Sequence, residues 1–396
     1  MGTVSVSQAG TDRTRKRIPE IDFWRGLALI VILVDHVPWN GLDSLTPRNF
    51  GFSDAAEAFV FLSGVSVSFA YGPTLQKAGF GRLVERCATR AAKLYLVQIV
   101  LVAFSIAIPL ATAAAVGDQA VGWGISRFVD SPVSSLIGAV SLAYQPNLSN
   151  VLALYVVLML WAPVVIFLAS RSAAWTLLAS IAIYVVGRGR VEVDGDGWYF
   201  NPLAWQLLFA IGVIGVSRWR SGLPRPQGRL VVLALAIILG GAVLSIRTAG
   251  LRATALSYLD LDKHDLGVVR LAHFLALAYV ISTVAIVEPW ATHMRGIVNS
   301  RIGQSLRGMG RNSLLFFALG AVASAGGRSL MDAAHFLAAS NLSVHLIGFV
   351  YTTAAVIFMF ALVNRMATPL GLSIEKSNPA TQMNSLPPEV NKGAVP

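Results

Sequence analysis

The sequence predicts an all-α polytopic membrane protein, built as a single bundle of about ten transmembrane helices with both termini in the cytoplasm. Hydrophobic residues make up 55% of the 396 residues and charged residues only 13%, well below the roughly 25% of a soluble domain. The mean hydropathy is +0.65. Apolar windows long enough to cross a bilayer as a helix recur along most of the chain, which excludes an ordinary soluble domain.

Short polar segments separate these apolar windows, so we expect one bundle rather than several domains. A basic N-terminal segment at 1–17 precedes the transmembrane domain at 18–366. The polar, Pro-rich residues 367–396 are expected to form a flexible cytoplasmic tail. The expected spans are 23–39, 54–72, 92–115, 148–169, 173–187, 203–217, 229–246, 267–287, 312–326 and 342–364.

The distribution of basic residues gives the expected orientation. Lys and Arg gather in alternate polar segments, and about 22 of the 31 fall on the side that the positive-inside rule assigns to the cytoplasm. The segments on the other side are rich in Asp and Glu. The net charge of +11 is therefore interpreted as membrane topology, with membrane lipids rather than nucleic acid as the partner.

The first span carries ionisable side chains, which are costly in lipid and mark functional sites. Arg25 and His36 lie eleven residues apart, which is about three helical turns and roughly 16 Å along the axis. Both side chains therefore point from nearly the same face, one near each end of the span. This geometry is expected if chemistry connects the two sides of a membrane.

Two carboxylates begin the second span at the depth of His36. Asp54 and Glu57 are three residues apart and share a helix face. Asp35 adjoins His36 but points about 100° away, which makes it a poor partner for the imidazole. We expect Glu57 or Asp54 to orient the ring, so that His36 acts as a general base on an attacking hydroxyl. The alternative is a histidine at a helix end, bonded to a loop carbonyl.

A cationic stripe lies after the second span. Arg82, Arg86 and Arg90 recur every four residues, and guanidinium groups bind phosphate bidentately, so the stripe suits the phosphates of a cytosolic ligand. Anchoring to anionic lipid explains the same residues. Arg311 lies at the cytoplasmic start of the ninth span beside Ser313, which is placed to cap that helix.

The outer end of the sixth span carries aromatic and amide side chains. Asn201, Trp205 and Gln206 suit either a sugar-binding platform or an aromatic belt at the membrane interface.

The eighth span and the loop before it carry three further cationic or titratable groups. Lys263 lies in the loop, and Arg270 and His273 lie three residues apart on one face of the span. An arginine within a span faces the bundle interior. Arg270 is therefore assigned either to a ligand or to an ion pair with Asp262 or Glu57.

Several enzyme classes gain no support from the sequence. The segment FLSGVSVSF does not match the G-x-S-x-G pattern of serine hydrolases. Neither an HExxH motif nor a phosphate-binding glycine loop occurs. The single cysteine, Cys87, excludes an intrachain disulfide and a cysteine metal site. We therefore expect no metal and no permanently bound cofactor.

The residues resemble a known family. Arg25 and His36 are similar to the R-x10-H motif of the membrane acyltransferase-3 superfamily. More specifically, five blocks resemble the OpgC family, which attaches succinyl groups to osmoregulated periplasmic glucans. The blocks occur in order between about residues 18 and 320 and read IDFWRGLALIVILVDH, FSDAAEAFVFLSG, NPLAWQLLFAIG, DKHDLGVVRLAHFLALAY and GRNSLLFF.

The resemblance implies a ten-helix bundle in the bacterial inner membrane. It also implies an acyl-coenzyme A donor in the cytoplasm, taken as succinyl-coenzyme A, and a glucan acceptor in the periplasm. The family's conserved histidine falls on His36 and its first-helix arginine on Arg25. The DKHDL sequence of the fourth block and the short outer loops depart from the family pattern, which leaves the identity of the glucan open.

The resulting hypothesis is an inner-membrane O-acyltransferase with acyl-coenzyme A as co-substrate and His36 as general base, oriented by Glu57 or Asp54. Arginines at the cytoplasmic face bind the coenzyme, namely Arg25, Arg82, Arg86, Arg90 and Arg311. Residues at the outer face bind the acceptor or acyl group, namely Asn201, Trp205, Gln206, Lys263, Arg270 and His273. Among these, Asn201, Gln206 or Arg270 supplies the oxyanion donor, and Lys263 or Arg270 the cation for a succinyl carboxylate.

The main alternative is a proton-coupled transporter or a flippase of a sugar or lipid-linked glycan, since intramembrane ionisable residues also describe such proteins. A transporter of that kind commonly shows two related halves with broken helices at the midplane, and no such pairing is evident in the sequence. Small residues in the spans would also allow a homo-oligomer, although nothing selects one helix face.

Overall fold

The computed structural model describes residues 18–117, 125–191, 198–220, 226–247, 259–337 and 340–367. These residues form helices and no strands, which confirms the all-α class. The segments 1–17 and 368–396, which contain the predicted basic N-terminal segment and flexible tail, lie outside the described residues.

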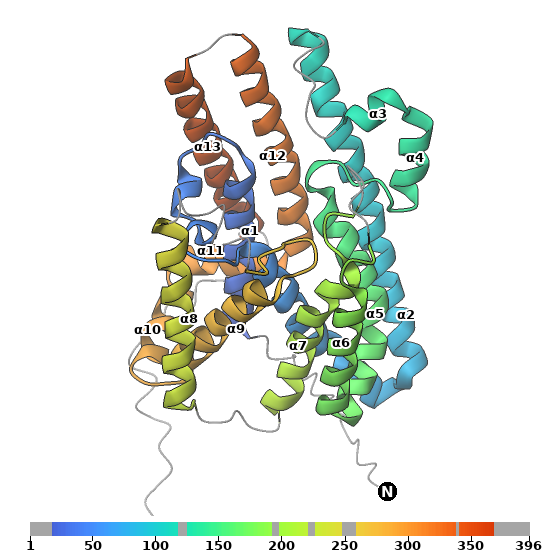
Figure 1. The fold of residues 1–396 in the computed structure, drawn as a ribbon, viewed down its shortest axis with the longest axis vertical. Coiled ribbons are helices and arrows are strands. Elements are labelled where there is room, and N and C mark those ends of the chain that lie inside the picture. Colours follow the sequence, from blue (N-terminus) through green and yellow to red (C-terminus); the bar gives the residue numbers. More distant parts are fainter. Residues whose placement is uncertain are drawn as a thin grey trace, which may run out of the picture.

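The first helix lies in the middle of the molecule (Figure 1). Helix α1 runs from Pro19 to His36, with proline at its first position and Glu20 and Asp22 in its first turn. Proline fits the first helical position because its missing N–H would be unsatisfied there, and acidic residues complement the positive end of the helix dipole. The chain turns extended at Val37, so His36 is the last helical residue.

The second helix contains two of the expected spans. Helix α2 runs from Ala55 to Val116 and is interrupted at Gly79, whose backbone is non-helical at φ 80° and ψ 178°. Glycine adopts this left-handed φ without steric cost. The two arms fold back against each other there, since Arg86 of the second arm donates a hydrogen bond to Thr74 of the first arm over 2.5 Å. Figure 1 shows this reversal at the lower end of α2.

The remaining long helices agree closely with the expected spans. Their starts and ends differ from the predicted spans by a few residues, except that α12 extends ten residues further. They are α5 (Asn150–Arg171), α6 (Ala173–Gly187), α7 (Pro202–Arg220), α8 (Gly228–Arg247), α9 (Val268–Val284), α12 (Ser313–Phe336) and α13 (Asn341–Ala367).

Shorter helices occupy segments that the sequence predicts as polar connections. Two of them, α10 and α11, lie in the basic segment before α12, and α11 packs along α1. Helix α11 buries Leu306 and Met309 while Arg301 is exposed, so it is amphipathic. The short helices are η1 (Leu42–Leu45), η2 (Pro47–Asn49), α3 (Ser126–Asp130), α4 (Pro132–Val140), η4 (Asn147–Ser149), α10 (Trp290–Asn299) and α11 (Arg301–Arg311).

Five of the described helices are long and apolar enough to cross a membrane: α2, α5, α8, α12 and α13. Three shorter apolar helices, α6, α7 and α9, accompany them. Helix α1 has 18 residues but carries Glu20, Asp22, Arg25 and Asp35. The protein is therefore a helical membrane protein, and ten crossings with cytoplasmic termini remain a prediction.

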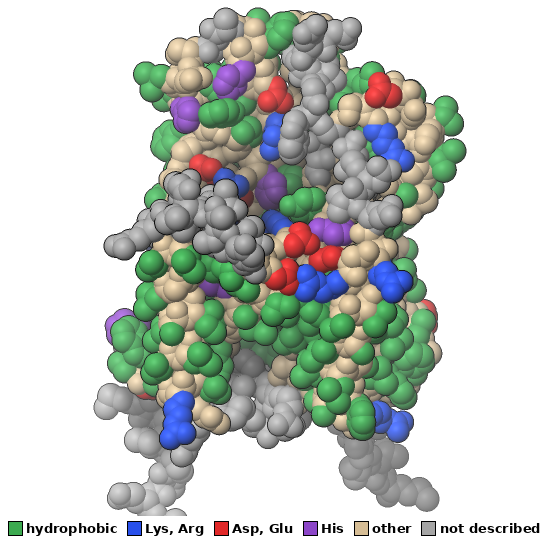
Figure 2. All heavy atoms as spheres, in the orientation of Figure 1, with side chains coloured by type: hydrophobic (Ala, Val, Ile, Leu, Met, Phe, Trp, Pro, Cys, Tyr) green, Lys and Arg blue, Asp and Glu red, His purple; other side chains and the backbone are tan. Residues whose placement is uncertain are grey.

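The exposed surface separates by residue type. Figure 2 shows acidic and basic side chains together in the middle of one face, above a band of hydrophobic side chains over α6, α7 and α8. Exposed Leu, Ile and Val side chains on these helices are expected where a surface faces lipid.

The contact between α2 and α7 provides a matched test of packing. A Cβ atom on Gly212 would lie 2.3 Å from the Phe61 carbonyl oxygen, whereas a Cβ on Gly215, one turn further along α7, would meet no atom within 4 Å. Gly212→Ala should lower the free energy of unfolding by about 1–3 kcal/mol because the backbones must separate. Gly215→Ala should be neutral or stabilising by up to about 1 kcal/mol. Thermal unfolding in detergent measures both, and equal effects would contradict this helix contact.

Candidate active site

Arg25 lies in the first half of α1 and pairs with the start of α12. Its guanidinium donates a hydrogen bond to the Ser313 hydroxyl over 2.5 Å. One helical turn before it, Asp22 faces Arg311 over 3.5 Å. The prediction that Ser313 caps α12 is wrong, because Asn312 occupies the N-cap position and Ser313 is the first helical residue. The Ser313 side chain instead joins α12 to α1.

His36 is the last residue of the same helix, and its ring is hydrogen-bonded to a backbone carbonyl group of α1 itself. Its Nδ1 lies 2.7 Å from the carbonyl oxygen of Ile32. A carbonyl oxygen only accepts, so Nδ1 carries the proton and the neutral ring keeps its lone pair on Nε2. This arrangement leaves Nε2 as the basic atom of the ring.

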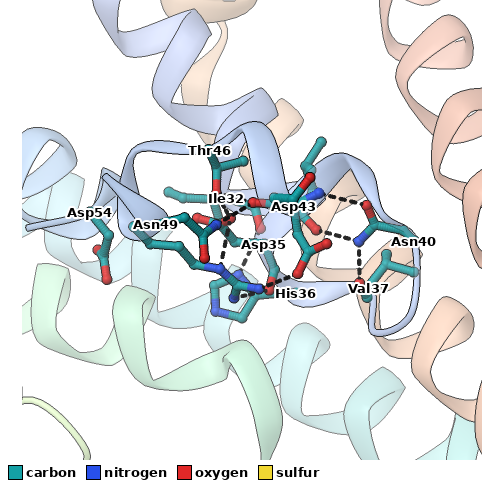
Figure 3. Close-up of polar contacts among 12 residues, drawn as sticks. Ile32, Asp35, His36, Val37, Asn40, Asp43, Thr46, Asn49 and Asp54 are labelled. Atoms are coloured by element: carbon teal, nitrogen blue, oxygen red, sulfur yellow. Dashed lines mark hydrogen bonds and ion pairs between the residues drawn. The ribbon is translucent and has the colours of Figure 1, made fainter. Parts of the chain in front are cut away.

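The structure corrects the expected partner of this imidazole. Within the described residues, neither Asp54 nor Glu57 forms a hydrogen bond with His36, and the Ile32 carbonyl fixes the tautomer instead. Figure 3 shows Asp54 set apart from the ring, with no interaction drawn between them. Asp54 still acts electrostatically on His36 from that position. The alternative interpretation of His36 placed this bond on a loop carbonyl, whereas the observed acceptor lies in α1 itself.

A small cavity lies between the Arg25 and His36 positions. Arg25, Leu29, Ile32 and His36 succeed one another at helical spacing on one face of α1. Leu29 and Ile32 line the cavity from α1. The other lining residues are Leu148, Val151, Phe316, Phe317, Gly320 and Ala321, from η4, α5 and α12. The cavity has room for no more than about one water molecule, so the face that joins the two polar groups is closely packed and almost entirely apolar.

The loop after His36 is fixed by its own polar network, drawn in Figure 3. Asp35 accepts a hydrogen bond from the Thr46 hydroxyl over 2.5 Å and pairs with Arg48 over 3.4 Å. The buried Asn40 amide donates to the carbonyl oxygen of Val34 over 2.9 Å. These bonds point Asp35 into the loop, away from the His36 ring, as the helical spacing predicted. The end of α1 is therefore held in one conformation.

The start of α2 carries a cluster of four charged residues, Asp54, Glu57, Lys263 and Arg270, which we call the charge cluster. Lys263 lies 2.6 Å from Asp54, and Arg270 lies 3.6 Å from Asp54 and 3.3 Å from Glu57. Arg270 also donates to the carbonyl oxygen of Phe52 over 2.9 Å. The predicted ion pair between Arg270 and Glu57 is confirmed, and Asp54 takes the place proposed for Asp262.

The two carboxylates of the charge cluster also begin α2. Asp54 accepts from the Ala56 backbone N–H over 2.8 Å, and Glu57 accepts from the Asp54 backbone N–H over 2.7 Å. This reciprocal capping box satisfies N–H groups that have no partner within the helix. Glu57 is completely buried. The capping bond and Arg270 both engage its carboxyl group and offset part of the cost of burying it.

Lys263 is held in its charged form by this environment. Burial opposes the charge, but the carboxylates of Asp54 and Glu57 outweigh burial and raise the pKa of Lys263 above its ordinary value. A quarter of the side chain remains exposed. Lys263 is therefore a permanent cation at the edge of the site.

His273 lies on the same side of α9 as Arg270, as its spacing predicted. Its Nδ1 is 2.8 Å from the Ser53 hydroxyl, and the residue is buried. Both side chains therefore attach α9 to the residues just before α2. No pattern in the sequence indicates Ser53 as the partner.

The predicted sugar platform is buried in the protein. Asn201, Trp205 and Gln206 are 0%, 0% and 3% exposed. The Asn201 amide donates to Asp265 over 2.7 Å, and the Trp205 indole donates to the Lys263 carbonyl oxygen over 3.1 Å.

The Gln206 amide is engaged in the same way, since it donates to the Ser180 carbonyl oxygen over 2.8 Å. The amides of Asn201 and Gln206, which were candidates for the oxyanion donor, are therefore already occupied. The structure gives the three residues a supporting role, because they hold the loop that carries Lys263 and join α7 to α6.

The three arginines of the cationic stripe lie in three different environments. Arg82 pairs with Glu85 on the surface over 2.6 Å. Arg86 lies with its guanidinium 5.3 Å from the centre of the Tyr71 ring. Arg90 is half-buried and close enough to Arg25 to act on it electrostatically. Of the three, Arg90 is the one that the structure brings toward Arg25.

The described residues contain no cluster of three or more His, Cys, Asp or Glu side chains that could hold a metal ion. A protein-family model described as OpgC protein matches residues 17–363. No curated protein and no solved structure gives a significant match. The family match covers α1 to α13 and so includes every residue of the candidate site.

The charge cluster predicts a large difference between two glutamate substitutions. Glu57→Gln removes a buried charge beside Arg270 and should lower the free energy of unfolding by about 2–3 kcal/mol. Glu85→Gln breaks an exposed ion pair of similar chemistry and should change it by less than about 0.5 kcal/mol. Thermal unfolding of the two purified variants measures this difference. A Glu57→Gln protein as stable as wild type would contradict the structural role of the cluster.

Proposed function

Because the chain belongs to the OpgC protein family, we propose that it is an O-acyltransferase of the bacterial inner membrane. It moves a succinyl group from succinyl-coenzyme A in the cytoplasm to a hydroxyl of a periplasmic glucan. Family membership supports a glucan succinyltransferase, and the apolar helices support a membrane protein. The geometry of the site and the resemblance of the sequence support the choice of donor, acyl group and base.

The observation that carries the proposal is the pair of polar groups at the two ends of one apolar face of α1. His36 presents a basic Nε2, because Nδ1 is bonded to the Ile32 carbonyl oxygen. Arg25 is anchored to α12 through Ser313 about three turns away. The cavity lined by Leu29 and Ile32 lies between them. An apolar helix face with a cation at one end and a base at the other suits a thioester that reacts far from its charged carrier.

The reaction then needs one proton acceptor. The glucan hydroxyl attacks the thioester carbonyl carbon, and His36 Nε2 takes the hydroxyl proton as the new carbon–oxygen bond forms. Collapse of the tetrahedral intermediate breaks the carbon–sulfur bond and expels the coenzyme A thiolate. The imidazolium then returns its proton to the thiolate. The Ile32 carbonyl keeps the ring oriented throughout, and the Asp54 carboxylate offsets part of the opposing charge of Lys263.

Arginines at the other end of α1 are proposed to hold the coenzyme phosphates. Arg90 acts electrostatically on Arg25. Arg311 pairs with Asp22, which lies one helical turn before Arg25 on α1. Guanidinium groups bind phosphate bidentately and stay charged at all relevant pH values. Arg82 and Arg86 lie further out on the same arm and would meet the nucleotide end of the coenzyme.

A cation for the succinyl carboxylate is available at the outer end. Lys263 is partly exposed and permanently charged, whereas Arg270 is almost completely enclosed by its carboxylate and carbonyl partners. We therefore assign the succinyl carboxylate to Lys263.

Loss of the base should affect turnover more than donor binding. His36→Ala should lower kcat for transfer of labelled succinyl to a β-glucan by about 10²-fold or more, because a general base contributes about that factor. Binding of coenzyme A should be retained. His293→Ala, a change at an exposed histidine of α10, provides the control and should keep wild-type turnover. Full activity of His36→Ala would exclude His36 as the base.

Loss of Arg25 should instead weaken donor binding. Arg25→Ala should raise the Kd for coenzyme A about tenfold or more, the effect of losing one charged hydrogen bond. Arg171→Ala, at an exposed arginine of α5, is the control. Calorimetry on detergent-purified protein measures both values, and Arg25→Lys separates charge from folding. Wild-type protein without any affinity for coenzyme A would favour the proton-coupled transporter instead.

A further inference from the structure

An aromatic patch lies just beyond the candidate base. The Trp39 ring lies 4.9 Å from the His335 ring and 5.2 Å from the His345 ring, measured between centroids. These three residues, which we call the Trp39 patch, come from the loop after α1, from α12 and from α13. Trp39 is 46% exposed. Figure 2 shows histidine side chains exposed at the end of the molecule formed by α12 and α13.

The patch lies close to His36 through both the loop and α12. Trp39 is three residues beyond His36 in the chain. A Cβ atom on Gly327 of α12 would lie 2.9 Å from the Val37 side chain, so α12 passes directly beside the end of α1. Arg328 is the next residue of α12 and acts electrostatically on His36. The Trp39 backbone therefore lies within about 11 Å of the His36 backbone, the reach of three residues.

Helix α12 extends this surface with two charged groups. Arg328, Asp332 and His335 are spaced by four and three residues and so share one helix face. Arg328 and Asp332 also influence each other electrostatically. Arg328, at the level of His36, and His335, in the Trp39 patch, are about two helical turns apart on this face, roughly 11 Å along the axis.

The backbone holds Trp39 in a conformation that a non-glycine residue rarely adopts. Its φ is 59°, in the left-handed region. The buried Asn40 side chain fixes this turn by donating to the carbonyl oxygens of Val34 and Val37. Residues held in such conformations cluster at ligand-binding positions. The loop therefore holds the Trp39 backbone in one conformation, and the His335 and His345 rings contact its indole.

The chemistry of the patch suits a sugar ring. His335 and His345 each bond Nδ1 to a carbonyl oxygen of their own helix, over 3.2 Å and 2.8 Å. These bonds leave the Nε2 atom of each ring to hydrogen-bond with hydroxyl groups of a ligand. The indole offers a flat apolar face for the C–H side of a pyranose. Asp332 and Arg328 add an acceptor and a donor set on the same surface.

We propose that the Trp39 patch, with Arg328 and Asp332, binds glucose units of the acceptor adjacent to the unit that reacts at His36. This inference rests on the proposed function, and it adds the surface that recognises the glucan. The same tryptophan would serve equally as an anchor at the membrane interface, where indole rings are enriched. Acceptor binding separates the two roles.

The test compares Trp39→Ala and Trp39→Phe with Trp175→Ala in the purified full chain. Trp175 is 74% exposed on α6, so its loss is the matched control for removing a surface indole. The KM for a β-linked glucose oligosaccharide and kcat are measured at saturating succinyl-coenzyme A. Equilibrium dialysis of the labelled oligosaccharide gives binding without turnover. Coenzyme A binding and thermal unfolding verify that each variant is folded.

Trp39→Ala should raise KM and the dialysis Kd about tenfold or more, the loss expected for an aromatic anchor. Its kcat should change far less. Trp39→Phe should recover most of the affinity, and Trp175→Ala should match wild type.

A Trp39→Ala protein that binds the oligosaccharide as wild type does would overturn the acceptor surface while leaving the proposed function intact. Equal weakening in Trp175→Ala would do the same, because it would indicate a general membrane effect. Wild-type protein that neither binds nor acylates the oligosaccharide would overturn this inference together with the proposed function.

Discussion

The site depends on how the protein neutralises the charged residues that it buries at the start of α2. Asp54 and Glu57 are balanced by Lys263 and Arg270 from the segment before and within α9, and the two carboxylates also cap α2. Unpaired charges at this position would be strongly unfavourable. The charge cluster therefore attaches α2 to α9 and to the loop that carries Lys263. His36 lies close enough to be affected by its electrostatic field.

The carboxylates of Asp54 and Glu57 are engaged within the charge cluster, so His36 is oriented by its own helix. The Ile32 carbonyl oxygen holds Nδ1, so the position and tautomer of His36 are properties of α1 alone. Arg25 lies on the same helix and is attached to α12 through Ser313. The distance between His36 and Arg25 is consequently set by helix geometry. Under the proposed function, a rigid spacing of this kind is what a carrier-bound thioester of fixed length requires.

Apolar windows in the sequence predicted the positions of α5 to α9, and helical spacing predicted the shared face of Arg25 and His36. The pairing of Arg270 with Glu57 was one of the alternatives that the sequence left open. Contacts that depend on loops could not be predicted in this way. Asn201 and its neighbours were predicted to form a sugar platform, but they are buried against the loop before α9, whose path no periodicity encodes. The kink at Gly79 and the helix α11 were also missed, because both lie in basic segments whose charge suggested only polar connections.

In the proposed reaction, one site joins a donor and an acceptor on opposite faces of a membrane. A direct test traps a β-glucan inside proteoliposomes, adds labelled succinyl-coenzyme A outside, and measures the label on the enclosed glucan. Transfer across the membrane along α1 predicts labelled glucan in sealed vesicles without entry of the coenzyme. Label that appears only after detergent opens the vesicles, when both substrates share one compartment, would contradict this route.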